Sequence, residues 1–182
     1  GDIGNETSFC YLCEYDYNLL VSILLKNKDI DINKKIVYSL YLAVEKENID
    51  IVKLLLSNVK NDVNLCYKIN SIEELNKESD IDHVIKKFTT EEAPLFVAIK
   101  NENLEIIKLL LSNSNIDVNF GYKRKIEKQK IRNNKTSIKI EEKSPLCQAI
   151  EIENIEIIEH LLKNEKIDVN FVYKLEGKGR II

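Results

Sequence analysis

Residues 94–119 read PLFVAIKNENLEIIKLLLSNSNIDVN, two apolar segments separated by four polar residues. In the second segment, Leu104, Ile107 and Leu111 recur at intervals of three and four, which places them on one face of an α-helix together with Leu110. Pro94 opens the first segment, and the first turn of a helix tolerates a residue without an N–H. The stretch therefore predicts two short helices joined by a tight link.

This pattern occurs four times without gaps, and each copy ends in Asp-x-Asn. The copies are residues 8–33, 39–64, 94–119 and 145–170. Self-similarity of this kind is the signature of repeat proteins, in which each copy is one structural unit and neighbouring copies bury a shared core. Residues with capping side chains precede the helices and are predicted to be their N-caps: Thr7 and Ser144 for first helices, and Asn48, Asn103 and Asn154 for second helices.

The fourth copy reads Ser-Pro-Leu-Cys-Gln-Ala at residues 144–149 and Asp-Val-Asn at 168–170. It resembles the ankyrin repeat, whose consensus begins Thr-Pro-Leu-His-x-Ala and ends in Asp-Val-Asn. The resemblance implies an all-α solenoid of stacked antiparallel helix pairs, in one domain over residues 1–182. Its units are expected at about residues 7–33, 38–64, 93–119 and 144–170.

Two departures from the ankyrin consensus affect the expected structure. The consensus His is replaced by an apolar or aromatic residue in every copy, namely Cys10, Tyr41, Phe96 and Cys147. The consensus glycines are also missing, so left-handed backbone after the second helix is expected at an asparagine, the residue that tolerates it best after glycine. The candidates are Asn27, Asn58, Asn113 and Asn164.

Two loops between units are longer than the repeat requires, because the Asp-x-Asn signatures are 31, 55 and 51 residues apart against about 33 in the family. The insertions cover about residues 65–92 and 120–143, and residues 171–182 begin a further stem of the same kind. In the second insertion, residues 122–132 and 136–142 predict a β-hairpin around an Asn133-Asn134 turn. In the first, apolar residues between 71 and 88 predict a short helix.

Composition excludes several classes of protein. With 44% hydrophobic and 31% charged residues, the chain of 182 residues belongs with soluble globular proteins rather than disordered ones. A net charge of −3 gives no overall attraction to nucleic acid or anionic membranes. No apolar run approaches the ~18 residues that a membrane span needs, and residues 1–6 lack the features of a signal peptide. We therefore expect a cytoplasmic or nuclear protein that is not secreted.

The cysteines allow a chemical alternative, because Cys10 and Cys13 form a Cys-x-x-Cys that could bind zinc or act as a redox pair. Both positions are apolar in the other copies, where Val44, Ile99 and Ile150 align with Cys13. We therefore interpret these cysteines as small core residues. The catalytic and phosphate-binding motifs are also missing, so neither enzymatic activity nor a cofactor is expected.

The resemblance implies a protein-interaction module, a scaffold or adaptor that binds its partner with its first helices and fingers, the lengthened loops. The exposed first-helix positions carried over from the family are Glu14, Tyr15, Glu45, Lys46, Lys100, Asn101, Glu151 and Ile152. Tyr15 and Ile152 are expected to be the anchors because interface energy concentrates in such apolar side chains. A monomer that is part of a longer repeat array is expected, and the sequence does not indicate the partner.

A second alternative is nucleic-acid binding by the insertion at residues 123–143, which holds nine Lys or Arg against three Glu. Its basic candidates are Lys123, Arg124, Lys125, Lys128, Lys130 and Arg132. Tyr122 is the only aromatic residue near enough to stack on a base, so a solvated hairpin is favoured. The first insertion has seven acidic residues against four Lys, and this contrast in charge fits a charged protein partner equally well.

Overall fold

The computed structural model describes residues 8–27, 33–58, 64, 66–75, 84–130, 135–170 and 173–180. Eight helices in these ranges form four antiparallel pairs. The first helix of each pair is called an inner helix, and the second an outer helix. The inner helices are α1 (Ser8–Glu14), α3 (Asn33–Glu45), α5 (Pro94–Lys100) and α7 (Pro145–Glu151). The outer helices are α2 (Asn18–Lys26), α4 (Ile49–Asn58), α6 (Leu104–Leu111) and α8 (Ile155–Leu162).

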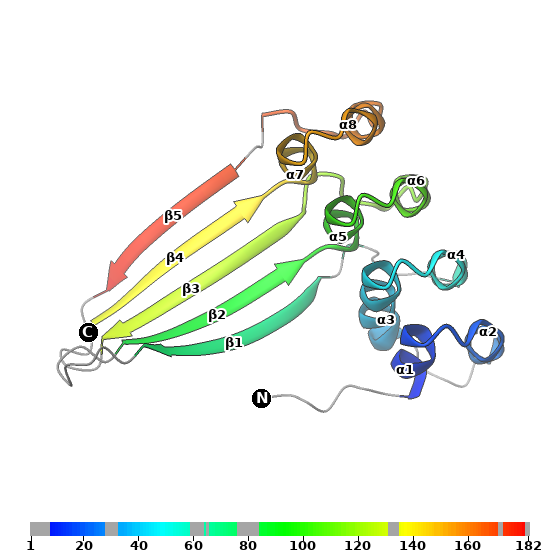
Figure 1. Cartoon of the computed structure of the whole chain (residues 1–182), viewed down its shortest axis with the longest axis horizontal. Coiled ribbons are helices and arrows are strands. Elements are labelled where there is room, and N and C mark those ends of the chain that lie inside the picture. The colour runs from blue at the N-terminus through cyan, green and yellow to red at the C-terminus, as the bar shows by residue number, and fades with distance from the viewer. Residues whose placement is uncertain are drawn as a thin grey trace.

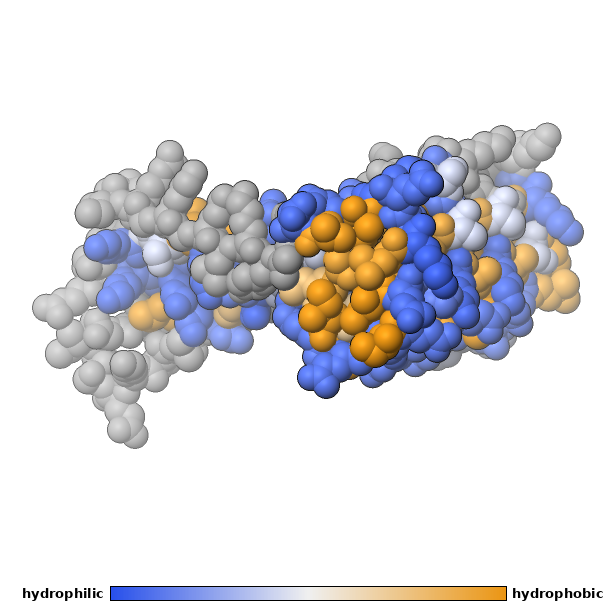
Figure 2. Space-filling view, turned by 90° about the horizontal axis from the view of Figure 1, so that it is seen from above, coloured by the Kyte–Doolittle hydropathy of each residue, from blue (hydrophilic) through white to orange (hydrophobic). Residues whose placement is uncertain are grey.

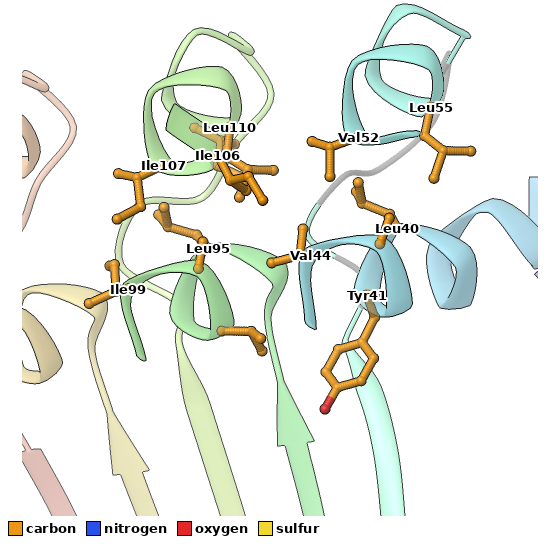
Figure 3. Close-up of a cluster of buried hydrophobic side chains, with 14 of the residues drawn as sticks. Leu40, Tyr41, Val44, Val52, Leu55, Leu95, Ile99, Ile106, Ile107 and Leu110 are labelled. Carbon is orange, nitrogen blue, oxygen red and sulfur yellow. The ribbon is translucent and has the colours of Figure 1, made fainter. Parts of the chain in front are cut away.

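The helix pairs stack in chain order, so that the inner helices make one column and the outer helices a second (Figure 1). The core lies between the columns. Leu95 and Ile99 of α5 are fully buried and point toward Ile107 and Leu110 of α6 (Figure 3). Ile107 and Leu110 belong to the apolar stripe predicted from the sequence, and its other members, Leu104 and Leu111, are half-buried against the core. At the α7 end of the stack, Ile150, Ile155 and Leu162 are exposed, and Figure 2 shows the apolar surface over this pair.

Capping side chains begin the helices where the sequence predicted them. The Ser144 hydroxyl accepts a hydrogen bond from the Cys147 N–H at the start of α7, and the Asn103 side chain accepts one from Ile106 N–H at the start of α6. Asn48 and Asn154 act in the same way. Thr7 lies outside the described residues.

The tight link between the two helices of a unit contains one residue with left-handed backbone. These residues are all acidic and occupy the same repeat position: Asp16, Glu47, Glu102 and Glu153, with φ between 56° and 63°. The prediction that asparagines after the outer helix would have this conformation is wrong. Asn113 and Asn164 instead accept backbone hydrogen bonds through their side chains, from Asn115 and Lys166 respectively, and this closes the loop without left-handed backbone.

Two ladders of hydrogen bonds join successive units. In the first, the amide of each N-capping asparagine donates to the acidic link residue of the preceding unit: Asn48 to Asp16, Asn103 to Glu47, and Asn154 to Glu102. In the second, the last residue of the Asp-x-Asn signature clamps the loop of the following unit. Asn119 donates to Lys166 C=O and accepts from Asp168 N–H. The repeated asparagines therefore fix the stacking of the units.

The lengthened loops form a five-stranded antiparallel sheet, so the prediction of an all-α fold is wrong. The strands follow chain order: β1 (Tyr67–Leu75), β2 (Val84–Glu92), β3 (Tyr122–Lys130), β4 (Lys135–Lys143) and β5 (Tyr173–Arg180). The predicted hairpin of the second insertion is confirmed as β3 and β4, although its Asn133-Asn134 turn lies outside the described residues. The sheet extends away from the helices as a single layer (Figure 1).

The described residues of the first insertion form β1 and β2 rather than the predicted helix, and residues 76–83 lie outside the described residues. Apolar residues at Ile72, Val84 and Phe88 satisfied a helical spacing in the sequence. In the structure, however, β2 pairs along its whole length with β1 on one side and with β3 of the next insertion on the other. Pairing on both edges satisfies the backbone of β2 completely, and a lone helix in this position would leave the edge of β3 open.

Candidate functional site

The sheet meets the inner helices along a seam formed by its first row of residues. Tyr67, Glu92, Tyr122 and Lys143 are direct cross-strand partners and therefore point to the same side. We call this side, with every second residue from this row onward, the inner face of the sheet. The opposite side is the outer face. All four residues contact side chains of inner helices.

Aromatic rings make up much of the seam. The Tyr67 ring lies 4.6 Å from the ring of Tyr38 and 4.6 Å from that of Tyr41, both on α3. Tyr41 points from α3 toward the sheet (Figure 3). One unit further along, the Tyr122 ring stacks on Phe96 of α5 at 5.6 Å. Burial raises the pKa of Tyr122, so its phenol is neutral at physiological pH.

A buried carboxylate lies between two of these units. Glu92 is only 7% exposed, and it accepts hydrogen bonds from the Tyr41 hydroxyl at 3.4 Å and from Lys100 Nζ at 3.3 Å. Burial, followed by the charges of Glu45 and Glu92, raises the pKa of Tyr41. The phenol therefore keeps its proton and remains a donor to Glu92.

The last unit is joined to the sheet by a polar contact. Lys143 Nζ lies 2.7 Å from a carboxylate oxygen of Glu151 on α7. The Cys147 thiol contacts the other oxygen of Glu151 at 3.8 Å. Burial and the Glu151 charge raise the pKa of Cys147. Each of α3, α5 and α7 is thus tied to the sheet by side-chain contacts, and the seam is a continuous surface of helix and strand.

The eight predicted first-helix positions lie at or just after the ends of the inner helices. Lys100 and Glu151 contact the sheet, and the eight differ in exposure. Tyr15, Glu45, Lys46, Lys100 and Glu151 are exposed, whereas Glu14, Asn101 and Ile152 are half-buried. Asn101 donates hydrogen bonds to Val44 C=O and Glu45 C=O of the preceding unit. Ile152 packs against the core. Asn101 and Ile152 therefore also hold the stack together, and Tyr15, at 56% exposed, is the most accessible apolar candidate.

The basic residues of the second insertion are divided between the two faces. Lys123 and Lys125 are on the outer face, where Lys123 pairs with Glu142 at 2.7 Å and Lys125 with Glu127 at 2.5 Å. Arg124, Lys128 and Lys130 are on the inner face. The Arg124 guanidinium lies 4.6 Å above the centre of the Phe88 ring. Arg132 is outside the described residues.

Sequence reasoning missed Tyr38 and Glu92 at the seam, and Phe88 on the inner face of the sheet beyond it. Tyr67 and Tyr122 have a signal in the sequence, because each is followed by a lysine at the start of an insertion, as Tyr173 is after the fourth unit. Glu92 had none. Its role depends on a pairing partner, Tyr122, that lies 30 residues away in the sequence.

The cysteines have the environment of core residues. Cys10 and Cys13 are 2% and 0% exposed, and Cys10 Sγ accepts a hydrogen bond from the Ser39 hydroxyl. Burial raises the pKa of Cys13 to about 12, which keeps the thiol protonated, whereas metal ligation and redox exchange need the thiolate. The described residues contain no group of three or more His, Cys, Asp or Glu that could hold a metal ion. His83 is outside them, and His160 Nδ1 donates a hydrogen bond to Glu156 C=O of its own helix.

Comparison with known proteins identifies the family. The family model for ankyrin repeats, in three copies, matches residues 65–173, and the chain therefore belongs to the ankyrin repeat family. No curated protein and no solved structure matches it. Ankyrin repeats are in general protein–protein interaction modules without enzymatic activity. None of the helices in the described part of the chain is long and apolar enough to span a membrane.

Proposed function

We propose that this protein is a scaffold or adaptor that binds a protein partner along the seam between its inner helices and the inner face of its sheet. The observation that carries the proposal is that the inner helices and the sheet are in direct side-chain contact along the seam. Aromatic, carboxylate and lysine side chains from three inner helices and four strands meet there. Tyr41, Phe96 and Glu92 are buried in this junction and fix its shape. The exposed charges beside them, on Glu45, Lys100 and Glu151, can orient a partner.

Rigidity of the seam supports the proposal. Tyr67 is held between two rings of α3, and Glu92 is fixed by two donors. Side chains that are ordered before binding lose little conformational entropy on association. The exposed rings of Tyr11 and Tyr15, 4.5 Å apart on and just after α1, continue the aromatic surface at the other end of the column.

The test compares two exposed apolar residues of similar exposure. Tyr15 is 56% exposed beside the inner column, and Leu162 is 49% exposed on outer helix α8. The partner is first isolated with the intact chain as bait. Isothermal titration calorimetry then compares Tyr15→Ser with Leu162→Ser, and thermal melts check that each variant remains folded.

We expect both variants to unfold within about 0.5 kcal/mol of wild type, as is usual for surface changes. Tyr15→Ser should weaken partner binding by about 1 kcal/mol or more, because exposed aromatic residues carry much of the energy of interfaces. Leu162→Ser should leave the affinity unchanged. The proposal fails if Leu162→Ser weakens the complex and Tyr15→Ser does not.

A further inference from the structure

The two faces of the sheet differ in how charges are placed across the strands. On the outer face, lysines are opposite glutamates: Lys68, Glu91, Lys123 and Glu142 alternate in one row, and Lys87 is opposite Glu127. Lys68 pairs with Glu91 at 2.7 Å in this row, and Lys123 with Glu142 at 2.7 Å. Opposite charges across strands stabilise a sheet. The charges of the outer face therefore stabilise the sheet.

The inner face shows the reverse arrangement in its half farther from the helices. Lys86 of β2 is directly opposite Lys128 of β3 on one side and Glu73 of β1 on the other, and Lys130 of β3 is directly opposite Lys135 of β4. Like charges in direct opposition destabilise a sheet. Within the described part of the chain, no salt bridge involves Lys86, Lys128 or Lys130. Glu73 offsets the charge of Lys86 in part, but Lys128 and Lys130 have no opposite charge directly across from them on either side. An anionic ligand would supply one.

Arg124 extends this basic surface toward the seam. Its guanidinium lies on the Phe88 ring at 4.6 Å and hydrogen-bonds the Tyr122 side chain, and its Nε is buried without a hydrogen-bond partner. The carboxylate directly across from it, Glu141, is paired with Lys139 instead. A guanidinium that is held flat on a ring can present its N–H groups to an incoming carboxylate at little entropic cost.

We infer that the inner face of the sheet binds an acidic segment of a protein partner, with carboxylates on Lys86, Arg124 and Lys128. This inference rests on the proposed function and names the chemistry of the partner at the same surface. A polypeptide fits better than a nucleic acid for two reasons. The Phe88 ring is covered by Arg124 and cannot stack on a base. Toward the seam, the exposed carboxylates of Glu45 and Glu151 would repel the evenly spaced phosphates of a nucleic acid, whereas a polypeptide can carry its carboxylates only where the basic residues lie.

The experiment uses three fluorescein-labelled probes at about 150 mM salt, where long-range attraction is screened. They are a peptide of repeated Glu-Glu-Leu triplets, its Lys-Lys-Leu counterpart, and a thymidine oligonucleotide with the same charge as the acidic peptide. Fluorescence anisotropy measures binding to the intact chain. We expect the acidic peptide to bind, and the basic peptide and the oligonucleotide to bind at least ~10-fold more weakly.

Matched variants on the same two strands locate the site. Lys86→Gln/Lys128→Gln removes two charges from the inner face, and Lys87→Gln/Lys125→Gln removes two from the outer face. We expect the inner-face variant to weaken binding of the acidic peptide at least ~10-fold and the outer-face variant less than ~2-fold. The inner-face variant should also melt close to the wild-type temperature, because it removes both the like-charge pair Lys86–Lys128 and the opposite-charge pair Glu73–Lys86.

Several outcomes would overturn the inference. Equal weakening by both variants would mean a general effect of net charge, and tighter binding of the oligonucleotide would mean a nucleic-acid surface. A lower melting temperature of the inner-face variant would show that these lysines serve folding. If the acidic peptide does not bind while Tyr15→Ser still weakens the isolated partner, the inference fails and the proposed function stands. If Tyr15→Ser also has no effect, both fail.

Discussion

The helix stack and the sheet are stabilised by different interactions. In the stack, side chains such as Leu95, Ile107 and Leu110 are fully buried between two columns of helices. In the sheet, among side chains that the structure describes, the buried apolar ones are Phe88 and Ile126, at 7% and 9% exposed. No helix of the described residues covers either face of the sheet beyond the seam (Figure 1). The sheet is a single layer held by backbone pairing, ion pairs and a small apolar cluster.

Because of this difference, the stack can supply the stability of the chain while the sheet carries residues for binding. Burial of apolar surface is the main source of folding free energy, so the stack supplies most of it and determines where the sheet begins. A single-layer sheet buries few side chains, so substitutions on its inner face cost little stability. That face can therefore carry residues that serve binding. The like-charged pair Lys86 and Lys128 is tolerated in the sheet because the stack stabilises the chain as a whole.

The largest expected effect is the truncation of a core residue in the stack. Leu110→Ala should lower the free energy of unfolding by about 2–5 kcal/mol, because it leaves a cavity in a site closed on all sides. Ile126→Ala in the sheet should cost less than about 2 kcal/mol, because neighbouring side chains can collapse into the space. Urea unfolding measures both. An equal cost would show that the sheet is as tightly packed as the stack.

The junction between the two regions should be sensitive to one added methyl group. A Cβ at Gly121 would lie 2.6 Å from Lys143 O and 2.7 Å from Phe96 Cδ2. Gly121→Ala should therefore lower the free energy of unfolding by about 1–3 kcal/mol, as overpacking does elsewhere. Ser137→Ala, at an exposed position of β4, is the control and should change stability by less than about 0.5 kcal/mol. No loss in Gly121→Ala would mean that the sheet can shift freely against α5.

Stacking of the units should depend on the asparagine clamp. Asn119→Ala removes two hydrogen bonds to the next unit and should cost about 1–2 kcal/mol. Asn170 occupies the same repeat position, and no side-chain bond from it to another described unit is present. Asn170→Ala should therefore change the thermal midpoint very little. If the two variants are equally destabilised, the effect is local to the loop and the clamp is unimportant.

The smallest expected effect concerns the left-handed link. Glu153→Gly removes a non-glycine residue at φ 56° and should raise stability by up to about 1 kcal/mol. Glu102→Gly relieves the same strain at φ 57° but loses the hydrogen bond from Asn154. Its net effect should be smaller. Differential scanning calorimetry compares them, and an equal gain would show that the ladder from Asn154 contributes nothing.

The repeat units could be predicted because their signals are local. Apolar spacing in residues 104–111 and the capping residues Asn103 and Ser144 act within a few positions of the chain, and the structure confirms them. The β3–β4 hairpin was predictable for the same reason. The sheet as a whole was not, because β2 pairs with a strand of another insertion. Apolar residues in the first insertion fit a helix equally well until that distant partner is known.

The left-handed link was missed for a different reason. Glycine or asparagine is the usual residue in this conformation, and the sequence offers asparagines after each outer helix. The structure instead uses acidic residues, and Glu47 and Glu102 gain a hydrogen bond from the next unit. This contact between units offsets the local strain. The left-handed conformation of these acidic residues could not be predicted from the sequence of one unit alone, because it depends on that contact.

Lysine footprinting tests the central claim most directly, because lysines alternate between the two faces of the same strands. The chain is acetylated alone and in complex with its isolated partner, and mass spectrometry gives the modification rate at each lysine. The account predicts that the partner protects Lys86, Lys100 and Lys128, on the inner face and the seam, and leaves Lys87 on the outer face and Lys108 on α6 unchanged. Protection of Lys87 or Lys108 with no protection of Lys86 and Lys128 would contradict it.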